Sequence, residues 1–502
     1  MTPSYNPLIK SLGLCAMMCL SLFPSNSATI ENDTTLYHEP YRPQYHFTPA
    51  HRWIGDPCGL VKRGGKYLAY SWGGAESTDL VHWRELNNHA IKGMPPKSSA
   101  FTGSVVVDTL NSAGWGKDAM VAVFTLFDED SKKQSQAVAF SHDEGETYQF
   151  YDSNPVLDIW STEFRDPTVI RYEPTGKWVM AVAKALEKKV AFYESDDLKH
   201  WTWTSNFGPM GDSMRSWECP DLFQVTVEET GEKKWVLLVS INWAREQYFV
   251  GDFDGKKFIP DNPNADPIYV DDGMDYYASR VFQNWDSPKD SPTDDEVVTL
   301  GWVNYWDYAP QAPSKWGKGV WSIPRYYSLY NTPDGMRLRQ TPVKALESLR
   351  GKEVKIKKTY NAGTFPLPRI SAMENQYEIV ADLDVSSNDV AGFNMCVGDG
   401  RKVSLSYDAS TGYLTLDRTN CSDVKIKFFD RVSNSRIAAP GTRNISLRIF
   451  VDKSTIEIFA ENGKKVMTLL TYASPSQKGV EFFTQRGKAK LNLTAWPMKS
   501  IH

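Results

Sequence analysis

Short strand-like runs dominate the first two thirds of the chain, and long amphipathic helical patterns are scarce. Residues 103–107, 177–182 and 234–239 are largely apolar, rich in β-branched or aromatic residues, and have Gly, Asp or Pro nearby. Such runs are typical of buried β-strands. From about residue 365, apolar and polar residues alternate instead, for example over 377–384 and 446–452. Because period two indicates strands with one wet face, we predict an all-β protein that ends in a β-sandwich.

A degenerate repeat divides the first part of the chain. Residues 77–83 read STDLVHW, residues 195–201 read SDDLKHW, and related turns lie at 141–148 and 251–258. Successive copies start about 55–65 residues apart, which is the length of a four-stranded propeller blade with its loops. We therefore predict a five-bladed β-propeller over residues 40–345, a linker over 346–365 and a β-sandwich over 366–502. The charge run at 352–358 is interpreted as a solvated face of the linker.

The N-terminus has the pattern of a secretory signal peptide. A largely apolar run over 11–23 follows Lys10, and the small residues at 24–28 suit cleavage, so we assign residues 1–28 to this signal. The run is too short to span a bilayer, and no later segment is apolar for long enough. We expect a secreted, periplasmic or cell-surface protein. A lipid anchor on Cys15 or Cys19 is a weaker alternative, since neither follows a small residue.

Composition excludes several classes of function. The 502 residues carry a net charge of −5, which argues against nucleic-acid binding. The His and Cys residues form no zinc-binding pattern, so we expect no metal and no cofactor. After export, Cys396 and Cys421 could form a disulfide. The 17 Trp, 24 Tyr and 23 Phe suit both sugar rings and β-rich cores. We expect a monomer or weak dimer.

Three short segments place an acid beside Pro or Cys in an aromatic setting. They are residues 53–59 (WIGDPCG), 163–167 (EFRDP) and 217–221 (WECPD). The first strand of each propeller blade lines a central funnel, and these segments are one to two blade lengths apart, so their acids can converge on one axis. Glu218 lies between Trp217 and Cys219, a setting typical of a proton donor. Taken alone, Asp56 or Asp166 would more often be a turn residue, and Arg165 beside Asp166 could be a plain ion pair. Glu218 is less easily explained in this way.

Taken together, the segments resemble glycoside hydrolase family 32, the β-fructofuranosidases that include invertases, inulinases and levanases. Residues 53–59 match part of the family's first motif, 165–167 its Arg-Asp-Pro motif and 218–219 its Glu-Cys motif. Further matches follow in order at 101–104, 275–279, 301–306, 321–325 and 451–459. The resemblance covers nearly all of residues 43–500. It implies a five-bladed propeller followed by a β-sandwich.

The resemblance also implies roles for four residues. Asp56 would be the nucleophile, Glu218 the general acid and base, and Asp166 the stabiliser of the transition state. Arg165 would bind the same sugar ring and keep Asp166 ionised. The reaction would be a retaining double displacement, for which two carboxyls about 5–5.5 Å apart are required. The expected substrate contacts are Trp53, Trp72, Phe101, Thr102, Arg165, Tyr277 and Trp302.

The chain departs from the family pattern in its first motif. Gly55 and Cys58 replace two Asn residues, and the Gln-Tyr-Asn-Pro segment that often follows is missing. This variant resembles a branch that includes fructosyltransferases. We therefore predict an exported β-fructosidase that hydrolyses terminal fructosyl units of fructans (levan or inulin) or sucrose. The alternatives are a fructosyltransferase with sucrose as donor and a non-catalytic fructan-binding relative.

Overall fold

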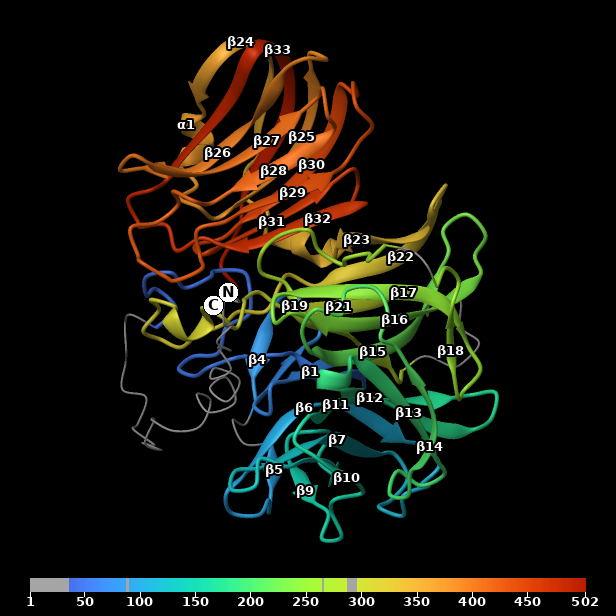
Figure 1. Ribbon diagram of the computed structural model, residues 1–502. Helices are drawn as coiled ribbons and strands as arrows, with labels where there is room; N and C mark the ends of the chain where they lie inside the picture. The colour runs from blue at the N-terminus through green and yellow to red at the C-terminus, as the bar shows by residue number, and fades with distance from the viewer. Residues whose placement is uncertain (1–35, 87–89, 264–265, 287–295) are drawn as a thin grey trace, which may run out of the picture.

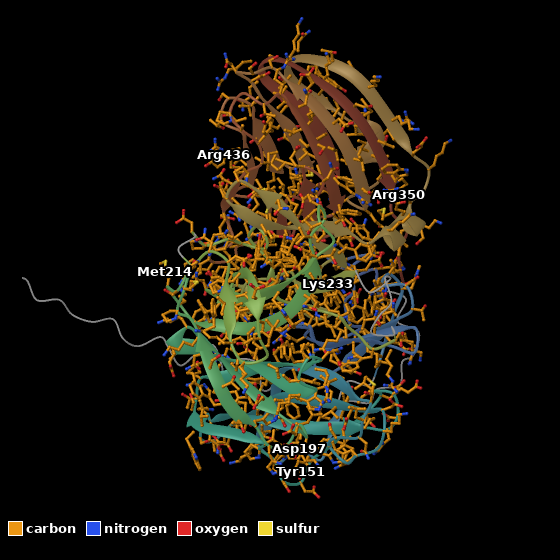
Figure 2. The ribbon with its side chains drawn as sticks, turned by 90° about the vertical axis from the view of Figure 1, so that its right-hand side faces the viewer. Tyr151, Asp197, Met214, Lys233, Arg350 and Arg436 are labelled. Atoms are coloured by element: carbon orange, nitrogen blue, oxygen red, sulfur yellow. The ribbon has the colours of Figure 1, made fainter. Side chains whose placement is uncertain are left out.

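The computed structural model describes residues 36–86, 90–263, 266–286 and 296–502, which form two β-rich parts stacked on each other (Figure 1). The N-terminal part is a ring of five β-sheets, and the C-terminal part is a sandwich of longer strands. The predicted five-bladed propeller followed by a β-sandwich is confirmed. Figure 2 places Tyr151 and Asp197 at the propeller end far from the sandwich, and Arg350 and Arg436 on the sandwich.

Each blade is a four-stranded antiparallel sheet with one inner strand at the axis, and one short strand pairs in parallel at the edge of each of the first two sheets. The first sheet contains β1 (Cys58–Arg63), β2 (Lys66–Tyr70), β3 (Gly74–Ser77), β4 (Trp83–Glu85) and β20 (Gln283–Asn284). The second contains β5 (Ile91–Lys92), β6 (Ser98–Asp108), β7 (Ala119–Asp128), β8 (Gln134–Ser141), β9 (Tyr148–Phe150) and β10 (Leu157–Ser161). The third contains β11 (Phe164–Tyr172), β12 (Lys177–Lys184), β13 (Lys189–Ser195) and β14 (Thr202–Phe207). The fourth contains β15 (Trp217–Thr226), β16 (Lys233–Ile241), β17 (Arg245–Phe253) and β18 (Phe258–Pro260). The fifth contains β19 (Tyr277–Val281), β21 (Val297–Trp302), β22 (Arg325–Thr332) and β23 (Gly335–Pro342).

The inner strands form a closed ring. Strands β1, β6, β11, β15 and β19 contact one another in that order, and β19 also contacts β1. Directly after β19, the short strand β20 pairs in parallel with β1. The last blade is therefore joined to the first by hydrogen bonds, which fixes the diameter of the funnel at the axis.

The sequence repeat is a turn that joins the third and fourth strands of a blade. In the first blade, Asp79 Oδ1 accepts hydrogen bonds from the backbone N–H of Val81 (2.9 Å) and His82 (2.8 Å). In the third blade, Asp197 Oδ1 accepts from Lys199 (3.0 Å) and His200 (2.8 Å) in the same way. An Asp at this position satisfies the backbone of the turn, which explains why the motif recurs in the first four blades.

The sandwich is built around one very long strand. Its strands are β24 (Val354–Pro366), β25 (Tyr377–Val385), β26 (Val390–Gly398), β27 (Arg401–Asp408), β28 (Tyr413–Asp417), β29 (Val432–Arg436), β30 (Asn444–Val451), β31 (Thr455–Ala460), β32 (Lys465–Leu470) and β33 (Gly479–Pro497). The first half of β33 pairs with β26, and its second half pairs with β25. This strand therefore belongs to both layers, and the alternating apolar residues of each layer fill the core between them. Helices are confined to α1 (Pro368–Ser371) and the 3-10 turns η1 (Ala185–Glu187), η3 (Ala309–Gln311) and η4 (Lys344–Leu349) among the described residues.

Two expectations from the sequence need correction. The segment 346–365 is not a linker, because most of it is η4 and strand β24, which pairs with β33 along its length. Its charge run lies on the solvent-exposed face of an edge strand. In sequence, such a strand resembles a solvated loop because most of its residues are polar. Cys396 and Cys421 are buried free thiols and form no disulfide.

A buried network of charged groups joins the two parts. His46, which precedes the first blade, contacts Asp452 through Nδ1 (2.9 Å) and Glu457 through Nε2 (3.0 Å). Arg325 of the fifth blade is paired with the same Glu457 and with Asp271 (3.1 Å). All these side chains are buried, so they hold the sandwich in one position over the propeller.

The predicted signal at 1–28 lies outside the described residues. Every helix in the described part of the chain is too short or too polar to cross a membrane.

Candidate active site

All five inner strands are interrupted near their first residues. In each, the pairing with the second strand of the blade shifts register, a sign of a β-bulge, and such bulges re-aim side chains. The shifts lie between Cys58 and Val61, Ala100 and Gly103, Arg165 and Thr168, Glu218 and Asp221, and Tyr277 and Arg280. Positive φ angles occur within these bulges at Gly59 (56°), Asp166 (66°), Cys219 (48°) and Ala278 (53°). The bulges coincide with the sequence motifs, so each motif turns one chemical group toward the axis.

Asp56 lies just before β1 and presents one carboxylate oxygen without a partner. Its Oδ2 accepts a hydrogen bond from Thr102 Oγ1 (3.2 Å) and a weaker one from Cys219 Sγ (3.7 Å). Its Oδ1 is buried and has no hydrogen-bond partner among the described residues. An unpartnered buried oxygen is costly, which makes this oxygen a candidate for reaction with a bound molecule.

Asp166 is held by the neighbouring Glu-Cys motif. Its Oδ2 accepts from the backbone N–H of Cys219 (3.0 Å) and from Cys219 Sγ (3.5 Å). Its own backbone N–H donates to Thr125 Oγ1 (2.8 Å). The thiol of Cys219 therefore lies between the carboxylates of Asp56 and Asp166, and links blades one, three and four.

Glu218 is paired with a cation and a phenol. Arg165 Nη2 donates to Glu218 Oε1 (2.7 Å), and the hydroxyl of Tyr277 donates to Glu218 Oε2. The other end of the Arg165 guanidinium binds Glu163 Oε2 (2.7 Å) and Gln134 Oε1 (3.1 Å). The side chain of Glu218 is thus fixed by polar groups, although the neighbouring residues in sequence are apolar.

The acids oppose one another's ionisation. Burial and the nearby charges of Asp166 and Glu218 raise the pKa of Asp56 to about 7. Burial also raises the pKa of Asp166, and the charge of Arg165 offsets this only in part. The charge of Arg165 thus acts on Asp166 in the direction that the resemblance implies, but burial outweighs it. Carboxyls that raise one another's pKa titrate as a group, so the cluster retains a proton near neutral pH.

A second cation supports the cluster from below. Arg280 follows the bulge of the fifth blade and is buried. It donates to the backbone carbonyls of Pro220 (2.6 Å) and Asp166 (3.2 Å), and to the hydroxyl of Thr168. It holds the bulges of the third and fourth blades together, and its charge partly offsets the effect of burial on the pKa of Asp56 and Asp166.

The predicted aromatic contacts divide into two groups. Trp53, Trp72 and Phe101 are partly exposed, and Trp72 Nε1 donates to the carbonyl of Phe101 (2.6 Å). Trp302 is fully buried behind Trp53, whose ring centroid is 6.2 Å away, so the expectation that it contacts substrate is not supported. Tyr277 is also buried, and its hydroxyl is used by Glu218. These two residues support the site from behind.

Family models match nearly all of the described chain. Residues 46–342 match the glycosyl hydrolases family 32 N-terminal domain, and residues 345–497 match the family's C-terminal domain. The chain belongs to glycoside hydrolase family 32. The resemblance noted in the sequence is confirmed, and the protein is a glycoside hydrolase.

Three relatives illustrate the range of this family. The chain is 35% identical to a levanase of Bacillus subtilis over 98% of this chain and 75% of that protein. It is 34% identical to a levanbiose-producing levanase of the same species, over 97% and 96% of the two chains. The crystal structure of exo-inulinase from Aspergillus awamori superposes with a TM-score of 0.83 at 28% identity, covering 93% of this chain and all of that one.

Several residues of this family 32 site have no signal in the sequence. Gln134 holds Arg165 and Arg280 fastens two bulges, yet neither stands in a motif that points to chemistry, whereas Glu163, which also binds Arg165, begins the EFRDP segment. The Cys219 thiol lies between two carboxylates that come from blades one and three, so its role cannot be read from its own segment. Cys58 differs, because it packs in the core between the first two blades with Val61 and Val105. Within the described residues, no group of His, Cys, Asp or Glu side chains is arranged to hold a metal ion.

Proposed function

We propose that this protein is an exported β-fructosidase that removes terminal fructosyl units from β-fructans and from sucrose by retaining hydrolysis. One observation carries the proposal: carboxyls from blades one, three and four are linked to one another through Cys219 and Arg165, and one oxygen of Asp56 has no partner among the described residues. The relatives named as levanases and as an exo-inulinase favour fructan as the polymer.

In the proposed first step, Asp56 Oδ1 attacks the anomeric carbon of the terminal fructosyl unit. Thr102 and Cys219 hold the other oxygen, so the reacting oxygen is oriented. Glu218 gives a proton to the departing oxygen as the glycosidic bond breaks. For this step Asp56 must be the ionised carboxylate, and the proton of the acid cluster must lie on Glu218.

In the second step, Glu218 takes a proton from water, and the water oxygen attacks the same carbon. The bond to Asp56 breaks, and fructose leaves with its original configuration. Asp166 would hold the hydroxyls of the ring and stabilise the positive charge that develops at the transition state. Arg165 would fix both Glu218 and the sugar, since its guanidinium lies between the acids.

The test is chromatography of early products from levan, inulin and concentrated sucrose in separate incubations, with the fructose anomer followed by NMR. Fructose alone from a polymer, released first as the β-anomer, is expected. The α-anomer would overturn retention, and oligosaccharides such as a disaccharide would mean endo action. Glucose in excess of fructose from sucrose, with new trisaccharides, would show transfer to sugar acceptors. Binding without any product would indicate a non-catalytic relative.

Export is part of the proposal. The apolar run over 11–23 and the small residues after it support a cleaved signal. N-terminal sequencing of the protein from culture medium or periplasm tests this, and a protein retained in the cell with residues 1–28 intact would contradict it.

A further inference from the structure

One tryptophan near the funnel is exposed in an unusual way. Trp160 of β10 is 83% exposed, and its backbone φ is 59°. Large rings are rarely left in water, and a bulky residue at positive φ is strained. A fold retains such a combination where the surroundings impose it, often at a binding site.

The ring is held in place by two charged neighbours. The backbone N–H of Trp160 donates to Asp158 Oδ1 (2.7 Å), and Lys133 Nζ lies 4.3 Å from the centre of the ring. Lys133 is itself paired with Asp158 Oδ2 (2.8 Å). The exposed ring is therefore accompanied by one hydrogen-bond donor and one acceptor, both partly accessible to solvent.

This group is connected to the catalytic acids. Strand β10 pairs with β8 of the second blade, and Ser161 lies opposite Gln134. Gln134 Oε1 accepts from Arg165 Nη1, and Arg165 binds Glu218. Trp160 is thus one residue away from a chain of contacts that ends on Glu218, the residue proposed to protonate the departing part of the substrate.

We propose that Trp160, with Lys133 and Asp158, binds a fructosyl unit of a polymeric substrate outside the funnel. The flat ring would stack against the C–H face of the sugar, and the two charged groups would meet its hydroxyls. This inference rests on the proposed function, because it needs a fructan chain whose end is bound at Asp56. It adds a second contact that sucrose is too short to use.

The surroundings of Trp160 favour a sugar over a protein partner. Its apolar neighbour in β10 is Ile159, which is only 37% exposed, and Lys133 and Asp158 lie at the ring. A single ring beside charges is far smaller than the apolar area of a stable protein interface. It is well matched to one sugar unit.

The test compares Trp160→Ala with the wild type on sucrose, short fructo-oligosaccharides and the preferred polymer. We expect KM for the polymer to rise about five- to twentyfold, as for loss of one stacking contact. KM and kcat for sucrose should stay within twofold, and Trp160→Phe should restore most of the loss. Trp203→Ala is the matched control, since Trp203 is 53% exposed on β14, the outermost strand of its blade. It should behave as wild type on every substrate.

Each outcome decides one point. A polymer KM unchanged in Trp160→Ala would overturn the inference while leaving the proposed function intact. Equal losses on sucrose and polymer would also overturn it, because they would mean that Arg165 had moved. Lack of turnover by the wild type on all substrates would instead refute the proposed function. Calorimetry then tests the contact without turnover. It compares the binding of a fructo-oligosaccharide to the Glu218→Gln variant and to the double variant that also carries Trp160→Ala.

Discussion

The molecule contains two groups of buried acids that behave in opposite ways. At the funnel, burial and like charges raise the pKa of Asp56 and Asp166. At the contact between propeller and sandwich, Asp452 and Glu457 are equally buried, yet hydrogen bonds and the charge of His46 lower the pKa of both, and the charge of Arg325 also lowers that of Glu457. The same residue types in the same protein are driven toward the protonated form in one place and the charged form in the other.

The difference lies in how cations and acids alternate. At the domain contact, Glu457 lies between His46 and Arg325, and Asp452 also accepts backbone N–H groups from Gln44 and Tyr45. At the funnel, Asp56 faces two acids and receives only a hydroxyl and a thiol. The first arrangement offsets the cost of burial and stabilises the fold. The second leaves that cost in place, which keeps the acids reactive and is typical of catalytic sites.

The largest effect is expected from removing the proton donor at the funnel. Glu218→Gln should lower kcat by about 10²–10⁴ because a general acid is lost, while fructan binding stays measurable by calorimetry. Glu163→Gln is the matched control, since Glu163 also pairs with Arg165 but does so at the other nitrogen of the guanidinium. Its kcat should fall less than tenfold. Equal losses in the two variants would mean that Glu218 acts only by holding Arg165.

The domain contact should respond in stability rather than in chemistry. Arg325→Met leaves Glu457 and Asp271 without their cation, and breaking a buried pair in this way costs about 3–5 kcal/mol. A lower thermal midpoint with near-normal kcat at low temperature is expected. Arg339→Met removes the more accessible pair with Glu228, which is worth about 0–1 kcal/mol. If both variants unfold at the wild-type temperature, the network does not stabilise the fold.

Features confined to one stretch of sequence were predictable. The blade turns, the acid motifs and the alternating strands each depend on a few consecutive residues, such as Asp79 with the backbone that follows it. Features that join distant residues were not. His46 and Asp452 are 406 positions apart, and the burial of Trp302 depends on Trp53. The sequence predicts a linker in place of strand β24 because its partner, β33, is the last strand of the chain and lies far from it in sequence.

Neutralising an acid at the funnel should stabilise the protein. The pKa of Asp56 is raised to about 7 from an ordinary 3.8, so its ionisation costs stability fully above pH 7 and not at all below 3.8. Asp56→Asn should therefore abolish activity yet raise the unfolding free energy by roughly 2–3 kcal/mol at pH 8, allowing for solvent in the funnel. Calorimetric scans at pH 8 and pH 4 check this, since the gain should vanish at pH 4. A lower midpoint for Asp56→Asn at pH 8 would contradict the view that ionised Asp56 destabilises the fold.

His46 provides the finest test of the opposite arrangement. Its hydrogen bonds to Asp452 and Glu457 outweigh burial and raise its pKa to about 9 from 6.5. The stability it contributes is fully present below pH 6.5 and is lost as pH rises through 9, which amounts to about 2 kcal/mol between pH 7 and 9. His46→Gln keeps a side chain that can hydrogen-bond but removes the charge, so its midpoint should lie below wild type at pH 7 and approach it at pH 9. His200→Gln, at an exposed pair with Asp197, is the control and should leave the pH dependence unchanged. A His46→Gln difference that stays constant across this range would mean that the ring is held as a neutral group, and that the acids of the contact are balanced by Arg325 alone.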